Sequence, residues 1–147
     1  MLRKRGFTLL ELVVAVLILG IIAAVAAPKL LVNTSDAADS AIAHTLSTLR
    51  DAIEMYRAQT MTGYPRGTSD EIHTKLDPYM RSSIFPPVNV GGIQNNNEVL
   101  VDSDDVPTVS ASSSAGWVYS PSSGEVRINS NSELASQPGS GIRYSDL

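Results

Sequence analysis

One apolar stretch near the N-terminus constrains this chain more than any other feature. It runs from Phe7 to Ala27, which is 21 residues, and it contains a single charged side chain, Glu11. As an α-helix it would extend about 31 Å, which matches the roughly 30 Å hydrocarbon core of a bilayer. The sequence therefore predicts a helix that spans a membrane once.

The residues before this stretch predict its orientation. Arg3, Lys4 and Arg5 precede the apolar residues, and positively charged flanks stay on the cytoplasmic side. Everything after Pro28 is then expected outside the cytoplasm. Removing these three charges changes the formal net charge from −4 to −7. An acidic protein of this kind excludes nucleic acid as a partner, because the phosphate backbone needs a basic surface.

Two ordinary interpretations of the apolar stretch leave something unexplained. A cleavable secretory signal has a shorter apolar core, roughly 7–15 residues, before a small-residue cleavage site. The small residues at 23–27 offer such a site, but the stretch is too long and contains a carboxylate. A plain membrane anchor leaves Glu11 unexplained, since a carboxylate within the membrane costs about 2.5–3.5 kcal/mol and usually has a function.

The residues around Glu11 resemble the cleavage motif of type IV prepilins and type II secretion pseudopilins. The matching sequence is RGFTLLELVV at residues 5–14, with a short basic leader that ends in Gly6. The resemblance implies that prepilin peptidase cleaves between Gly6 and Phe7 and that the new Phe7 amine is N-methylated. Residues 1–6 are then a cleaved leader, and the apolar helix stays in the mature protein.

The same resemblance assigns Phe7 and Glu11 a role in assembly. In a fibre of packed helices, the Phe7 amine and a neighbouring Glu11 carboxylate are both far from water. Two such charges are tolerated only if they are paired. We therefore expect Glu11 to pair with the Phe7 amine of the adjacent subunit and so to set the register. The alternative is that Glu11 only extends toward the lipid headgroups.

Gly20 and Pro28 are candidates for helix flexibility. Proline removes one backbone donor and clashes with the preceding turn of a helix. The resemblance implies that residues 20–28 bend or melt on assembly and make the fibre extensible. The alternative is that Pro28 only marks the end of the membrane span.

Beyond Pro28 the apolar residues keep a helical spacing. They recur at steps of three and four and form one stripe, made by Ala38, Ile42, Thr45, Leu46, Leu49, Ile53 and Tyr56. Asp39, Arg50 and Glu54 are placed on the opposite, solvated side, and Glu54 is spaced for pairing with an arginine on either side. The polar residues at 33–36 suggest a cap or a local break.

The helix is expected to end just before Gly63 and Pro65, which together form a helix stop. Residues 7–28 are thus the transmembrane and assembly helix, and residues 29–61 are its amphipathic extension. The remainder, residues 62–147, is predicted as a small β domain with many loops.

Three short segments of that domain predict strands. Residues 98–102 form one, and residues 117–119 and 125–128 flank a turn rich in proline, serine and glycine, which indicates a hairpin. Alternation directs Val126 and Ile128 toward the helix. The predicted fold is α+β: a long N-terminal helix, half transmembrane and half amphipathic, packed against a small antiparallel β-sheet with irregular loops. This order resembles the major pseudopilins of type II secretion.

Asp102, Asp104 and Asp105 are the candidate metal ligands. Major pseudopilins often bind calcium in a loop, and carboxylate oxygens suit that ion. The cluster lacks a turn glycine and a distal glutamate, so the alternative is an exposed acidic turn before Pro107. We expect no cofactor, with calcium as the one weak candidate.

No pattern in the sequence predicts catalysis. His44 and His73 are isolated, a G-x-S-x-G motif is absent, and the chain has no cysteine. We therefore expect that this protein is not an enzyme.

Three functions compete. The first is a structural subunit of a type II secretion pseudopilus that supports protein export, with other pilin-like subunits, prepilin peptidase and the inner-membrane assembly platform as its partners. The second is a type IV pilus pilin or minor pilin for adhesion, motility or DNA uptake. The third is a membrane-anchored binding domain that does not polymerise. The first two imply a single pass through the bacterial inner membrane and a periplasmic C-terminal domain.

Overall fold

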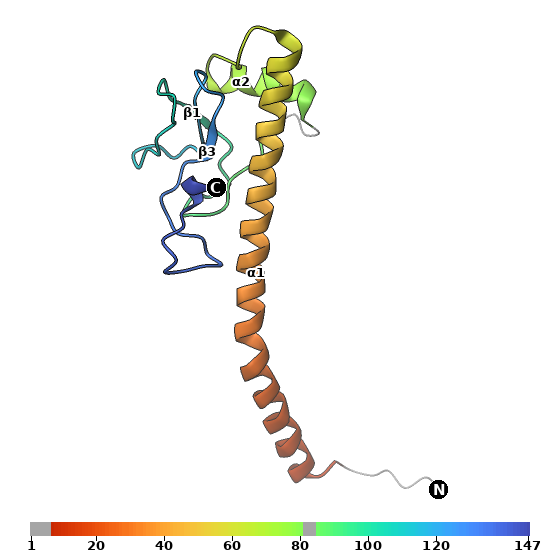
Figure 1. Ribbon diagram of the computed structural model, residues 1–147. Coiled ribbons are helices and arrows are strands. Elements are labelled where there is room, and N and C mark those ends of the chain that lie inside the picture. Colours follow the sequence, from red (N-terminus) through yellow and green to blue (C-terminus); the bar gives the residue numbers. More distant parts are fainter. Residues whose placement is uncertain (1–6, 81–84) are drawn as a thin grey trace, which may run out of the picture. The chain divides into compact units, whose positions relative to one another are not determined.

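The computed structural model describes residues 7–80 and 85–147, without the side chains of residues 28–33. The chain divides into two compact units with a boundary between Ser35 and Asp36. Helix α1, Leu9–Thr60, contributes its first part to the N-terminal unit and its remainder to the C-terminal unit (Figure 1).

The N-terminal unit is built from the apolar part of α1. Its residues Leu9–Ala27 are long and apolar enough to cross a membrane, with a mean hydropathy of 2.9 over 19 residues. The helical backbone continues through Gly20, through Pro28 and through the polar residues 33–36. The predicted break at 33–36 is therefore wrong, because the preceding turns of α1 already supply backbone acceptors to these residues.

In the C-terminal unit, α1 supplies one wall of the core. Its predicted apolar stripe is buried at Ile42, Leu46, Leu49 and Ile53. The prediction is wrong for Ala38, which is exposed. These buried side chains belong to the same hydrophobic core as the buried side chains of the sheet. Figure 1 shows the sheet and the C-terminal segment along one side of this part of α1.

α1 ends at Thr60, and the next residue, Met61, has a left-handed backbone conformation. Met61 has φ 53°, and its N–H donates to the carbonyl of Arg57 at 3.2 Å, which satisfies an acceptor that the helix end leaves open. Gly63 follows with φ 90°, which an L side chain would adopt only with strain. The helix stop predicted at Gly63 and Pro65 is thus confirmed to within a few residues.

A second helix, α2, Ser69–Leu76, was not predicted. Thr68 caps it: the Thr68 side chain accepts from the Glu71 N–H at 3.4 Å, and the Glu71 carboxylate accepts from the Thr68 N–H at 2.8 Å. This reciprocal capping box has a T-x-x-E signature that marks the start of a helix. A short 3₁₀ turn, η1 (Asp77–Tyr79), follows.

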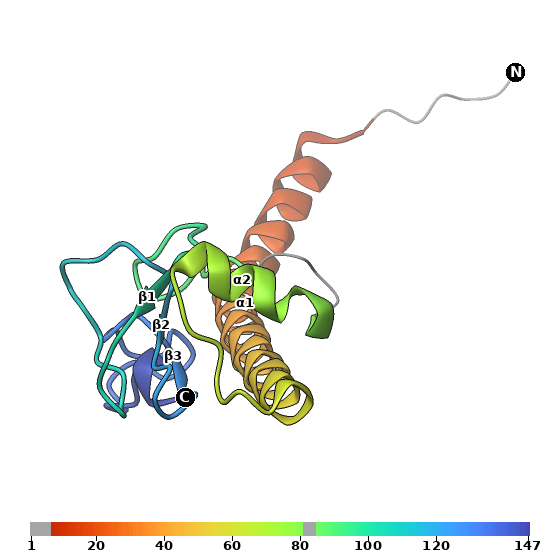
Figure 2. The ribbon, with the colours of Figure 1, turned by 90° about the horizontal axis from the view of Figure 1, so that it is seen from above.

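Three short strands form one sheet in the order β1-β2-β3 (Figure 2). They are β1 (Val99–Val101), β2 (Trp117–Tyr119) and β3 (Val126–Ile128). β2 and β3 are antiparallel, with Trp117 opposite Ile128, so the predicted hairpin is confirmed.

The α+β class is confirmed, but the sheet is mixed rather than antiparallel. β1 runs parallel to β2, with Val99 opposite Trp117. A parallel neighbour needs a connection of about a dozen residues or more, and the segment 102–116 between β1 and β2 has that length. The long loop returns the chain to the starting end of β1 before β2 begins.

The sheet turns its largest side chains into the core. Trp117 is fully buried, and its ring N–H donates to the carbonyl of Pro86 at 2.9 Å. Tyr119 is also buried, and its hydroxyl donates to the carbonyl of Pro65 at 3.0 Å. Val126 and Ile128 are buried as alternation predicted.

Two charged residues of α1 that were placed in solvent are instead contacted by the C-terminal segment. Asp39 is only 7% exposed; its carboxylate accepts from the Tyr144 hydroxyl at 2.5 Å and from the Ser136 N–H at 2.8 Å. The Arg50 guanidinium donates to the carbonyls of Leu147 and Val126 at 2.9 and 3.3 Å. Both solvent placements were wrong, because residues distant in sequence cover this side of the helix.

The contacts of Asp39 also set its acidity. Burial raises the pKa of the Asp39 carboxyl, but hydrogen bonds from Ser136 and Tyr144 stabilise the ionised form more strongly, so its pKa lies below the ordinary value. With the folded pKa lowered, the ionised carboxylate stabilises the fold above about pH 4, and this contribution is lost as the pH falls further.

We expect Asp39→Ala to lower the free energy of unfolding of the C-terminal unit by about 2–3 kcal/mol, because the Tyr144 hydroxyl loses a charged, buried acceptor. Trp117 is the single tryptophan of the chain and is buried, so its fluorescence during urea unfolding of the full chain in micelles reports the change. The difference from the parent chain should shrink on acidification.

Asp51→Ala is the matched control, because Asp51 is an exposed carboxylate on the same helix. It should change the free energy of unfolding by less than about 0.5 kcal/mol. In the Asp39→Ala background, Tyr144→Phe should lower the free energy of unfolding only slightly further, because the two residues share one hydrogen bond. Fully additive effects would contradict the coupling.

Candidate functional site

The apolar surface of α1 in the N-terminal unit is the main candidate site. Every residue from Phe7 to Ala27 is exposed, with Phe7 at 80% and Leu9 at 81%. A contiguous apolar surface of this size marks a site of membrane or protein contact. Because it surrounds the helix on all sides, it fits a lipid environment or a packed bundle of helices.

Glu11 and Thr8 together cap the N-terminus of α1. The Glu11 carboxylate Oε2 accepts from the Thr8 N–H at 2.9 Å and from the Thr8 hydroxyl at 2.9 Å. The Glu11 N–H in turn donates to the Thr8 Oγ1 at 3.2 Å. This is a second reciprocal capping box, which satisfies backbone donors that the first turn would otherwise leave open. As a result α1 begins at Leu9, and Phe7 precedes it.

The capping role of Thr8 was not predicted. The T-x-x-E spacing of Thr8 and Glu11 is visible in the sequence, but the resemblance assigns the glutamate a role in assembly alone. Within residues 7–80 and 85–147, the hydrogen bonds of the Glu11 carboxylate are made by Oε2, to Thr8.

The remaining predicted site residues lie apart from Glu11 in the sequence. Gly20 and Pro28 lie within α1. Gly6, and with it the predicted cleavage position, lies outside the described residues. The bending of residues 20–28 on assembly stays a prediction.

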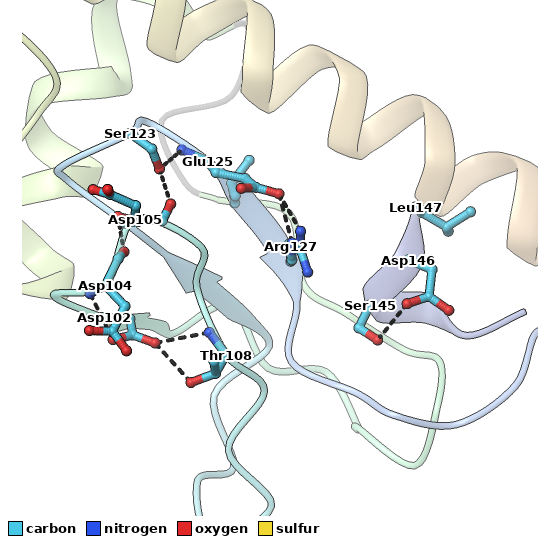
Figure 3. A network of polar contacts seen from close by, with 12 residues as sticks. Asp102, Asp104, Asp105, Thr108, Ser123, Glu125, Arg127, Ser145, Asp146 and Leu147 are labelled. Carbon is cyan, nitrogen blue, oxygen red and sulfur yellow. Dashed lines mark hydrogen bonds and ion pairs between the residues drawn. The ribbon is translucent and has the colours of Figure 1, made fainter.

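The acidic loop after β1 uses its own donors to hold its shape (Figure 3). Asp102 accepts from the Thr108 N–H at 2.9 Å and hydroxyl at 3.0 Å, and from the Asp104 N–H at 3.2 Å. The pKa of the Asp102 carboxyl lies below its ordinary value, chiefly because the backbone N–H groups of Thr108 and Asp104 donate to the carboxylate. The Ser123 hydroxyl donates to the carbonyl of Asp105 at 2.5 Å.

These contacts bear on the calcium prediction. The carboxylate of Asp102 is already occupied by the loop. In the described part of the chain, no three His, Cys, Asp or Glu side chains are grouped so as to hold a metal ion. Calcium binding at Asp102, Asp104 and Asp105 stays a prediction without support from this arrangement.

Comparison with known proteins bears on the N-terminal segment. The family described as the prokaryotic N-terminal methylation motif matches residues 1–27. Its match ends at Ala27, where the part of α1 that is long and apolar enough to cross a membrane also ends. Type II secretion system core protein G of Klebsiella pneumoniae is 40% identical over 55 residues, which cover 37% of this chain and 39% of that protein.

A second relative, type II secretion system core protein G of Pectobacterium carotovorum subsp. carotovorum, is 38% identical over 55 residues, which cover 37% of this chain and 35% of that protein. The chain thus spans less than two fifths of the length of either relative. No solved structure matches it.

Proposed function

We propose that this chain is a structural subunit of a type II secretion pseudopilus, which polymerises through α1 and supports protein export. One observation carries the proposal: a helix exposed over its whole apolar length, with a single carboxylate at its first turn, coincides with the methylation motif. Both relatives are type II secretion system proteins, which favours secretion over a surface pilus.

In this proposal the subunit first sits in the inner membrane. The basic residues at 3–5 keep the N-terminus in the cytoplasm, and the β domain lies in the periplasm. Prepilin peptidase removes residues 1–6 and leaves Phe7 at the new N-terminus. The inner-membrane assembly platform then adds the subunit to a filament of like subunits.

Assembly brings the Glu11 carboxylate to the Phe7 amine of the neighbouring subunit. Thr8 holds the carboxylate at the start of α1, so the charge stays near the subunit's own Phe7 and near the same end of each helix. In a water-poor bundle of helices, an unpaired carboxylate would be costly, whereas the pair neutralises both charges. The pair therefore selects one register among the many that an apolar surface allows.

The proposal predicts a mature N-terminus of methylated Phe7. Mass spectrometry of the membrane fraction, in cells that possess a prepilin peptidase, should detect an N-terminal peptide that begins with methyl-Phe7 and carries no leader. A bulky substitution such as Gly6→Leu should leave the leader attached, because the small residue before the cleaved bond is lost, whereas Gly6→Ala should be milder. An intact Met1 terminus on the parent chain would refute the processing step.

A further inference from the structure

The C-terminal unit contains an uncharged groove that the proposed assembly does not use. It encloses about 730 Å³, within the roughly 300–1,000 Å³ that ligand sites usually occupy. Three loops line it, at residues 91–96, 109–114 and 129–132. None of the lining residues is charged, although 18% of the chain is.

Side-chain hydrogen bonds hold these loops together. Asn129 accepts from the Ser110 N–H at 2.8 Å and donates to the carbonyl of Ala115 at 3.0 Å. The Asn96 amide donates to the carbonyl of Ser114 at 2.7 Å, and the Ser130 hydroxyl donates to the carbonyl of Gly91 at 2.8 Å. The walls are therefore formed before any ligand binds, which reduces the ordering cost of binding.

Gly91 shows how closely the walls fit. Its φ of 62° favours glycine, and a Cβ at this position would overlap the Ser130 hydroxyl oxygen. The close approach lets the Ser132 hydroxyl also reach the carbonyl of Gly91, at 3.2 Å. One wall of the groove is thus fixed to the segment that follows β3.

The groove also presents polar groups that have no hydrogen-bond partner among residues 7–80 and 85–147. The side chains of Gln94 and Ser114 and the amide nitrogen of Asn131 make no hydrogen bond to any residue that the structure describes. Together they offer both donors and acceptors. Ile93 and Val109 add apolar surface beside them.

We propose that this groove binds a neutral saccharide. An ionic ligand would need an opposite charge, and the lining has none. A peptide bound through its backbone usually adds a strand to a sheet edge, but no lining residue belongs to β1, β2 or β3. Sugar hydroxyls both donate and accept, so they can pair with the Gln94 amide, the Ser114 hydroxyl and the amide nitrogen of Asn131. The site does not depend on filament assembly.

The test is a titration of the ¹⁵N-labelled full chain in dodecylphosphocholine micelles, whose headgroup contains no sugar. Chitotetraose and maltotetraose are the probes, one with and one without N-acetyl groups. We expect at least one of them to shift the amide signals of Gly92, Gln94 and Asn131 saturably. The double variant Gln94→Ala/Asn131→Ala should bind about tenfold more weakly.

Gln137→Ala is the matched control, because Gln137 is exposed and lies outside the groove. It should bind like the parent chain. Unchanged ¹⁵N spectra of the remaining amides will show that the double variant is folded. Three results would overturn the proposal: no saturable shift with either neutral probe, shifts outside the groove, or binding only by a uronic acid oligomer or an uncharged peptide added in parallel.

Discussion

Glu11→Ala will give a processed, membrane-inserted subunit that is missing from filaments. The carboxylate is the single charge in the apolar part of α1. In the proposed filament, its removal leaves the neighbouring Phe7 amine unpaired in a water-poor bundle, at a cost of about 3–5 kcal/mol. This corresponds to at least a ~100-fold lower share of subunits in filaments. Quantitative immunoblotting of sheared filaments against the membrane fraction measures that share.

Glu11→Gln separates the two roles of the side chain. Glutamine also completes a capping box, so it keeps the contacts to Thr8 and the start of α1 at Leu9, but it cannot neutralise an amine. If pairing sets assembly, Glu11→Gln fails as Glu11→Ala does. If the helix cap alone matters, Glu11→Gln assembles like the parent chain and the pairing mechanism is refuted. Glu54→Gln, on the exposed side of the same helix, should assemble normally.

Trp117→Ala will lower the free energy of unfolding of the C-terminal unit by about 3–5 kcal/mol. Trp117 is fully buried at the centre of the sheet, and its ring lies 6.4 Å from that of Phe85 in an edge-to-face arrangement. Alanine leaves a large cavity and leaves the carbonyl of Pro86 without its donor. Small domains are stable by only about 5–15 kcal/mol, so the sheet should open much more often.

Hydrogen exchange of the full chain in micelles, read on peptides that contain β3, measures this opening without a tryptophan signal. Trp117→Phe is the control, because it keeps an aromatic ring against Phe85 and loses only the indole N–H and part of the volume. Trp117→Phe should lower the free energy of unfolding of the C-terminal unit by about 1–2 kcal/mol. Equal protection of β3 in both variants would show that the tryptophan core does not hold the sheet.

The elements that could be predicted are those whose signal is local. A helix long enough for a membrane follows from 21 consecutive residues with one charge. The stripe at Ile42, Leu46 and Leu49 follows from spacing, and the hairpin follows from two β-rich segments around a turn. The motif around Gly6 and Phe7 is also contiguous in sequence, so its resemblance to a known motif is visible without the fold.

Two misses had local signals as well. The T-x-x-E boxes at Thr68 and Thr8 are visible in the sequence, and each starts a helix in the structure. The T-x-x-E or S-x-x-E spacing recurs by chance in a chain rich in serine and threonine, so spacing alone does not identify the two true capping boxes. Their reciprocal hydrogen bonds in the structure identify them.

The apolar helix, its single carboxylate, the amphipathic stripe and the hairpin can all be predicted from the sequence, because each depends on neighbours along the chain. The parallel pairing of β1 with β2, the burial of Asp39 and the contact between Arg50 and Leu147 become visible only in the folded chain. Each of these joins segments separated by many residues, and periodicity cannot show which distant segment covers a helix face. Asp39 and Arg50 looked solvated because the hydroxyl and carbonyl groups that bind them come from the far end of the chain.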